Sequence, residues 1–271
     1  MFKTLIIIFS FLISYITADA ETLFLKAQNT SDAYSVIDEK LVFFSGSAVE
    51  VPDCSHGEFG PHITQAFDKI LKKLVFRFHI HREHDTDRCE KFDRQRTEIK
   101  VYDKSPDWIH AVEGSKFSYK WKFRLDERFQ PSRRFTHLHQ IKAVGGTEAR
   151  MPLITLTARK GRDSKPDRLE LRFGKKLKQK TLLKVNLGRF LGRWLEVIER
   201  ISVGENGKLF FQIKSFKSKD VLFQYENNSI RMWKTSADFL RPKWGIYRSL
   251  IEKEVLRDEV VDFADFEIIS N

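Results

Sequence analysis

Residues 117–125 read Phe-Ser-Tyr-Lys-Trp-Lys-Phe-Arg-Leu, with an apolar side chain at every second position and a polar one between. This period of two is that of a β-strand with one buried and one polar side. Residues 168–173, Arg-Leu-Glu-Leu-Arg-Phe, repeat the alternation. Further strand-like stretches, separated by glycine-containing turns, lie at 154–158, 194–203, 209–215 and 260–269. Many strands without helices between them predict an all-β sandwich or jelly roll.

One stretch fits two patterns. Residues 63–74 place apolar side chains along a helical face, whereas residues 74–81 alternate like a strand. We expect at most a turn or two of helix there. No repeat, low-complexity tract or linker divides the chain, so residues 21–271 are expected to form a single domain.

The first twenty residues have the pattern of a secretory signal peptide. A positive start at residues 1–3 precedes an apolar run over residues 5–16, and Ala18-Asp19-Ala20 is a small-x-small cleavage pattern. The apolar run is shorter than the roughly 20 residues that a membrane-spanning helix needs. We therefore expect residues 1–20 to be removed and the mature chain to be secreted, without a membrane anchor.

The chain has two cysteines, Cys54 and Cys89. In an oxidising compartment we expect them to form a structural disulfide, worth about 3–4 kcal/mol for a loop of this length. Asn29 and Asn227 each begin an Asn-x-Ser/Thr sequon, which predicts a glycoprotein if the host glycosylates.

The chain is basic, with 48 Lys and Arg against 37 Asp and Glu and a formal net charge of +11. Such a surface favours a polyanionic partner: nucleic acid, anionic membrane or acidic glycan. Secretion and the lack of a nucleic-acid-binding motif argue against nucleic acid. An acidic polysaccharide is the expected partner, although a basic surface that only aids solubility is the simpler alternative.

Three short segments place polar groups on one face of a strand. In residues 93–100, Arg94, Arg96 and Glu98 share a face. Glu98 could orient Arg96, whose planar guanidinium matches a carboxylate with two hydrogen bonds. The alternative is an ordinary surface ion pair, which contributes little.

The second segment, residues 135–142, contains two histidines. Strand alternation predicts that His137 and His139 point one way and that Gln140 and Lys142 point the other. A histidine could serve as a general base near neutral pH. Two histidines at i and i+2 could also bind a metal, and His79-Ile80-His81 repeats this spacing, but no third ligand follows at a convincing distance. No metal site is therefore expected.

The third segment, residues 241–248, presents Lys243, Gly245 and Tyr247 on one face of an extended strand. Gly245 would let a substrate approach the backbone between a cation and a phenol. Lys-x-Gly-x-Tyr also occurs by chance in edge strands, where the tyrosine simply packs.

Together, and in this order, these segments resemble the motifs of the jelly-roll polysaccharide lyases, a group that includes heparin lyase I, glucuronan lyase and the small alginate lyases. Those enzymes carry Arg-x-Glu, Gln-x-His and Lys-x-Gly-x-Tyr motifs. Arg96-Thr97-Glu98 matches the first and residues 243–247 match the third. The middle motif departs from the pattern, because Gln140-Ile141-Lys142 ends in lysine. The resemblance spans about residues 60–268 and implies a concanavalin-like β-jelly roll of two stacked antiparallel sheets with a concave substrate groove.

The resemblance implies a lyase that cleaves a uronic-acid polysaccharide by β-elimination. Gln140 and Arg96 would neutralise the uronate carboxylate, with Glu98 orienting Arg96. His139 is the first candidate for the base and Lys142 the second, and a local bulge in the strand would also allow His137 to supply it. Tyr247 would protonate the leaving oxygen or act as both acid and base. The remaining substrate-binding candidates are Arg94, His137, Lys243, Arg248, Lys120 and Lys122.

No cofactor is required by this chemistry, although the resemblance allows a structural calcium ion, and we expect a monomer. Two other functions stay open. A non-catalytic binding protein for acidic polysaccharides on the same fold is favoured by the loss of the motif histidine. A hydrolase of the related sandwich fold would need paired carboxylates on a strand, and the sequence shows no such pattern.

Overall fold

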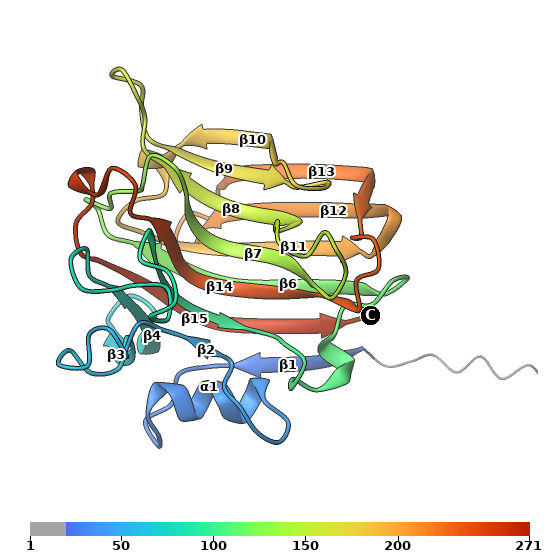
Figure 1. Cartoon of the computed structure of the whole chain (residues 1–271), viewed down its shortest axis with the longest axis horizontal. Coiled ribbons are helices and arrows are strands. Elements are labelled where there is room, and N and C mark those ends of the chain that lie inside the picture. Colours follow the sequence, from blue (N-terminus) through green and yellow to red (C-terminus); the bar gives the residue numbers. More distant parts are fainter. Residues whose placement is uncertain (1–19) are drawn as a thin grey trace, which may run out of the picture.

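The computed structural model describes residues 20–271 and contains two stacked antiparallel β-sheets (Figure 1). The first, named here the front sheet, has the order β10 (Lys180–Asn186), β9 (Arg168–Phe173), β8 (Ile154–Arg159), β7 (Thr136–Val144), β14 (Phe239–Ser249), β5 (Arg94–Lys100) and β2 (Val49–Glu50). The jelly-roll expectation is confirmed.

The second, the back sheet, has the order β13 (Val221–Met232), β12 (Gly204–Ser215), β11 (Trp194–Ser202), β6 (Lys116–Leu125), β15 (Glu259–Ser270), β4 (Lys73–Ile80) and β3 (Ile63–Asp68). Strand β1 (Glu21–Leu25) pairs with β15, and the helix α1 (Ala33–Leu41) lies beside it (Figure 1). Three short 3₁₀ segments complete the described chain, at Asp107–Ile109, Leu187–Arg189 and Lys253–Val255.

The apolar positions of the alternating strands form the core between the two sheets. Strand β6 buries Phe117, Tyr119, Trp121, Phe123 and Leu125, the five apolar positions of its period-two pattern. From the other side, Trp244 of β14 reaches the same layer, with its ring centroid 6.0 Å from that of Trp121. Burial of such large aromatic side chains is the main stabilising contribution in a fold of this kind.

The structure agrees with the expectation of at most a turn or two of helix near residues 63–81, but it adds a helix that the sequence did not predict. Residues 63–80 form the β3–β4 hairpin and contain no helical turn. The helix α1 was not expected; Asp32 caps it by accepting hydrogen bonds from the amides of Tyr34 and Ser35. Its apolar residues Val36, Ile37 and Leu41 pack onto the core.

The predicted disulfide between Cys54 and Cys89 is present, with 6.3 Å between the two Cα atoms. It joins the loop between β2 and β3 to the loop between β4 and β5. The expected signal peptide, residues 1–20, lies outside the described residues except for Ala20. Within residues 20–271, no helix is both long and apolar enough to cross a membrane.

Strand β7 contains an irregularity that positions the site. Its pairing with β8 shifts by one residue between His137 and His139, which is the signature of a β-bulge. Two consecutive side chains, Leu138 and His139, are therefore buried on the core side. His137 and Gln140, on either side of the bulge, both face the outer surface of the front sheet.

Candidate active site

A groove of about 670 Å³ lies on the outer face of the front sheet, across β5, β14, β7, β8 and β9. All three sequence segments meet there, because β14 pairs with β5 on one side and with β7 on the other. The strand floor contributes Arg94, Arg96, His137, Gln140, Lys142, Thr157, Arg159, Arg172, Arg241, Lys243 and Tyr247, and loops and the edge strand add Glu50, Arg88, Lys91, Arg134, Phe135, Arg150, Met151, Pro152 and Gln179.

The groove is strongly cationic. Eleven of its lining residues are Lys or Arg, whereas Glu50 is the one carboxylate among them. A cleft lined by one sign of charge concentrates a ligand of the opposite sign. The arrangement therefore suits a chain with repeated negative charges.

Tyr247 lies on the groove floor between two guanidinium groups. Arg94 donates a hydrogen bond from Nη1 to the phenol oxygen at 3.1 Å, and the Arg96 guanidinium stacks on the phenol ring at 3.7 Å. Burial raises the pKa of Tyr247, while Arg96 and Arg94 act in the opposite direction. The phenol is thus protonated at neutral pH and held in one orientation, as a proton donor must be.

Arg96 is fixed by carboxylates on three sides. Its Nε and Nη2 donate to the two oxygens of Asp87 at 2.7 and 3.1 Å, and its Nη1 donates to Glu98 at 2.5 Å. Glu50 lies 3.3 Å from the same Nη1. The expectation that Glu98 orients Arg96 agrees with this geometry, but most of the guanidinium donors are already used. Arg96 is therefore suited to positioning Tyr247, and few of its donors are left to bind a substrate.

Glu98 lies beneath the groove floor and is fully buried. It accepts from the Gln140 amide at 2.5 Å and pairs with the Lys243 ammonium at 2.8 Å, and Lys243 also pairs with Glu50. Although burial opposes ionisation, Lys243 and Arg96 keep the pKa of Glu98 low. Lys243 is buried in this network and supports the groove floor. From the sequence it was expected to bind substrate, but its ammonium is already paired with two carboxylates.

His137 is an uncharged base in the groove. Its ring stacks on Phe135 and lies 5.9 Å from the Tyr247 ring, measured between centroids. Its Nδ1 has no hydrogen-bond partner among the described residues. Burial, and to a smaller extent the cation Arg96, lower the pKa of His137 to about 3, so the imidazole is uncharged at neutral pH.

Lys142 occupies the place of the motif histidine and faces the groove beside Gln140. Burial and the neighbouring cations Lys243 and Arg241 lower its pKa to about 8. The amine is therefore largely protonated at pH 7, in surroundings that would gain from the arrival of a negative charge.

Two of the expected site residues point into the core instead. His139 is fully buried between the sheets, with Nε2 2.7 Å from the carboxylate of Glu199 on β11 and its ring against Trp121. The bulge in β7 explains the error, since it breaks the alternation that pairs His137 with His139. Arg248 is also fully buried, and it donates to Gln95 at 2.9 Å and to the Arg257 carbonyl at 2.8 Å. His139 cannot be the base, and Arg248 cannot bind substrate.

Lys120 and Lys122 lie on β6, in the other sheet, so they do not line the groove. Lys120 pairs with Glu267 at 2.8 Å and Lys122 with Asp265 at 2.5 Å, both across to β15. The alternation of residues 117–125 was interpreted correctly, but a single sequence does not say which sheet a strand joins.

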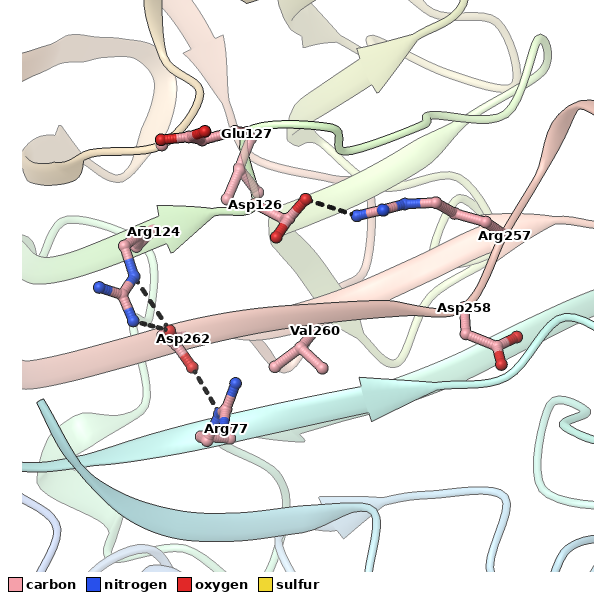
Figure 2. Close-up of a pocket in the computed structure, with 10 residues that line it drawn as sticks. Arg77, Arg124, Asp126, Glu127, Arg257, Asp258, Val260 and Asp262 are labelled. Atoms are coloured by element: carbon pink, nitrogen blue, oxygen red, sulfur yellow. Dashed lines mark hydrogen bonds and ion pairs between the residues drawn. The ribbon is translucent and has the colours of Figure 1, made fainter.

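The back sheet has a hollow of its own, of about 380 Å³, shown in Figure 2. Its charges neutralise one another: Asp262 accepts from both Arg124 and Arg77, and Asp126 pairs with Arg257 (Figure 2). This hollow lacks the excess of cations that distinguishes the groove, and it is a weaker candidate for an acidic ligand.

Several groove residues were missed from the sequence. Arg159 and Arg172 alternate with buried residues in β8 and β9 and carried a usable signal. Glu50 lies in a two-residue strand and Asp87 in a loop, so neither had a pattern that could reveal it.

Comparison with solved structures shows where this architecture occurs. The glucuronan lyase of the fungus Trichoderma reesei matches with a TM-score of 0.54 and 12% identity, over 90% of this chain and 93% of that one. The marine PL-14 alginate lyase of Aplysia kurodai matches with a TM-score of 0.58 and 14% identity, over 92% and 98%. Alginate lyase PA1167 of Pseudomonas aeruginosa gives 0.51 and 15%, over 81% and 96%.

The chain has the jelly-roll fold of these polysaccharide lyases. No protein-family model and no curated protein matches the sequence significantly. At identities this low, the comparison shows a shared fold. The match extends over 81–92% of this chain and 93–98% of the other chains.

Proposed function

We propose that this protein is a polysaccharide lyase that cleaves a uronic-acid-containing polysaccharide by β-elimination. The observation that carries the proposal is the pairing of Tyr247 with the uncharged His137 on the floor of a groove lined by eleven cations. The fold shared with glucuronan and alginate lyases supports it. The predicted signal peptide and the Cys54–Cys89 disulfide support secretion as part of the proposal.

The first task of such an enzyme is to neutralise the uronate carboxylate. The proton on C5 is weakly acidic beside an ionised carboxylate, and charge must build up on that group when the proton leaves. Lys142 supplies an ammonium that forms no ion pair with another residue of the described part of the chain, and the Gln140 amide lies beside it, held by Glu98. The motif lysine thus takes over a cationic role in place of the histidine.

The second task is proton transfer. The imidazole of His137, which lines the groove, accepts the C5 proton, and the electron pair of the C5–H bond forms the C4–C5 double bond. The C4–O4 bond breaks, and the Tyr247 hydroxyl, oriented by Arg94, gives its proton to O4. The imidazolium and the phenolate then exchange a proton with solvent or with each other, so no water is consumed. Arg159 and Arg172, farther along the groove, would bind carboxylates of neighbouring sugars.

The test is an ultraviolet absorbance assay of the mature protein on a panel of acidic polysaccharides, since the unsaturated product absorbs and the substrates do not. Tyr247→Phe should abolish the signal on the active substrate while binding persists. Tyr225→Phe, on β13 of the back sheet, is the matched control and should keep full activity. Absence of product on every substrate, with binding retained to one of them, would overturn the lyase and favour the non-catalytic binding protein.

A further inference from the structure

A cluster of histidines lies outside the groove, between the two loops that the disulfide connects. His56 and His62 belong to the loop between β2 and β3, and His81 and Asp85 belong to the loop between β4 and β5. The four ligand-type atoms of these residues all lie within 4.8 Å of one another. We propose that this cluster is a binding site for a divalent transition-metal ion of the zinc class.

The geometry of the three imidazoles points to a shared centre. His56 Nδ1 and His62 Nε2 each lie 3.1 Å from Oδ1 of Asp85, and His81 Nδ1 lies 3.2 Å from Oδ2. Three ring nitrogens from three positions in the chain thus converge on one carboxylate. Ligands of a tetrahedral zinc ion are roughly 3.4 Å apart, as follows from bonds of 2.0–2.1 Å, so small side-chain rotations would complete the site.

Internal hydrogen bonding does not satisfy the cluster. His81 Nδ1 is buried and has no hydrogen-bond partner of acceptable geometry among the described residues, although Asp85 is near. A buried polar nitrogen without a partner is unfavourable, and a metal ion would use its lone pair. Hydrogen bonding within the cluster therefore does not account for the buried position of His81 Nδ1.

The surroundings also match those of a metal centre. His62 turns its other nitrogen, Nδ1, to the carboxylate of Asp53 at 2.7 Å, which is the carboxylate–histidine arrangement that orients a metal-binding imidazole. Asp53 is held in turn by the Tyr34 hydroxyl at 2.8 Å. Phe59 covers the cluster, with its ring centroid 4.2 Å from that of His81.

The ligand set selects the kind of ion. Three imidazoles and one carboxylate suit Zn²⁺, Cu²⁺ or Ni²⁺, whereas Ca²⁺ requires six to eight oxygen ligands. The expected site is therefore not the structural calcium site that the sequence resemblance allows. An ion held by both loops would join them a second time, beside the Cys54–Cys89 bond.

The loop that supplies His81 and Asp85 also carries Asp87, which makes the two-pronged contact with Arg96. The proposed ion would therefore stabilise a segment that supports the groove, without touching the groove itself. The metal site does not depend on the proposed lyase reaction, and metal binding can be measured in an inactive protein.

The experiment starts from the mature protein, stripped with a chelator, dialysed and titrated with Zn²⁺ by calorimetry. One ion should bind per chain, and Zn²⁺ at a hundredfold excess over Kd should raise Tm by about 5 °C. Co²⁺ in place of Zn²⁺ should give the intense visible absorption of a tetrahedral site. Failure of the wild-type protein to bind one equivalent would overturn the proposal.

Three variants test the ligand set. His56→Gln, at a half-buried loop position that should tolerate change, should weaken Zn²⁺ binding by more than about 100-fold. Asp53→Asn should weaken it by about 10–100-fold, because it orients a ligand without being one. His84→Gln is the matched control: this exposed histidine stacks on His56 but lies outside the set, so affinity should not change. Unchanged binding in His56→Gln, or lost binding in His84→Gln, would refute the assignment.

Discussion

Lys142 stands where the lyase motif has histidine, and its replacement by methionine measures what the lysine contributes. Its pKa is lowered from 10.5 to about 8 by burial and by the cations around it. This shift corresponds to about 3 kcal/mol of unfavourable environment for the charged amine. The negative charge of a uronate carboxylate would compensate for these unfavourable surroundings. It should therefore stabilise the transition state by a similar free energy. Lys142→Met should therefore reduce kcat/KM by about 10²-fold at pH 7, measured as the initial rate of ultraviolet absorbance.

The pH dependence provides the sharper test. In the proposed mechanism the charged form of Lys142 is the active one, and this form is lost as the pH rises through its pKa of about 8. The kcat/KM value reports the free enzyme, so it should fall about tenfold per pH unit above that point. Lys142→Arg keeps a positive charge at every accessible pH and should abolish this decline.

Two results would refute the reasoning. One is near-normal kcat/KM in Lys142→Met, which would show that the amine does not neutralise the carboxylate. The other is a rate that rises through pH 8 in the wild-type protein and no longer does so in Lys142→Arg, which would make the neutral amine the base. Circular dichroism of both variants would show that the fold is intact.

Further predictions concern the groove and the network below it. Arg159→Ala should raise KM by about tenfold on a polymeric substrate, whereas Lys120→Ala, on the back sheet, should leave KM within about twofold in the same assay. Glu98→Gln leaves buried cations without their carboxylate and should lower the free energy of unfolding by about 3–5 kcal/mol in a urea titration; a loss below 1 kcal/mol would contradict the buried network. Replacing both Cys54 and Cys89 by serine should lower the same quantity by about 3–4 kcal/mol, and equal stability of the variant and the wild-type protein would contradict a structural role for the bond.

The fold could be predicted because local pattern and tertiary structure agree over most of the chain. In β6, β8 and β9 the apolar and polar residues alternate without interruption, and each strand forms where the pattern places it. Strands β11 and β15 also form where they were expected, although the pairing of β15 with β6 shifts between Ala264 and Glu267. Strand β13 was not recognised, because half of its residues are polar, including the run from Glu226 to Ser229, and it buries few side chains. A strand of this kind is held by hydrogen bonds to its neighbour β12, and a local pattern does not report them.

The site was predictable only in part. Arg96, Gln140 and Tyr247 were found because their motifs keep fixed spacings within regular strands, and adjacent strands bring them together. Glu50 and Asp87 reach Arg96 from distant parts of the chain, and this contact depends on tertiary structure alone. Of the histidine cluster, only His81 was considered from the sequence. His56 and His62 come from the opposing loop, so spacing along the chain could not place them beside His81 and Asp85.

The bulge in β7 has a consequence for the way this strand can change. Leu138 is the extra residue of the bulge, so its deletion would restore strict alternation and leave every other side chain of β7 on its present face. His137, Gln140 and Lys142 would still face the groove, and His139 would still face the core. Loss of a residue from a regular part of the strand would instead turn one half of it over. The bulge therefore marks the point at which β7 can change its length by one residue without exchanging the groups that face the groove.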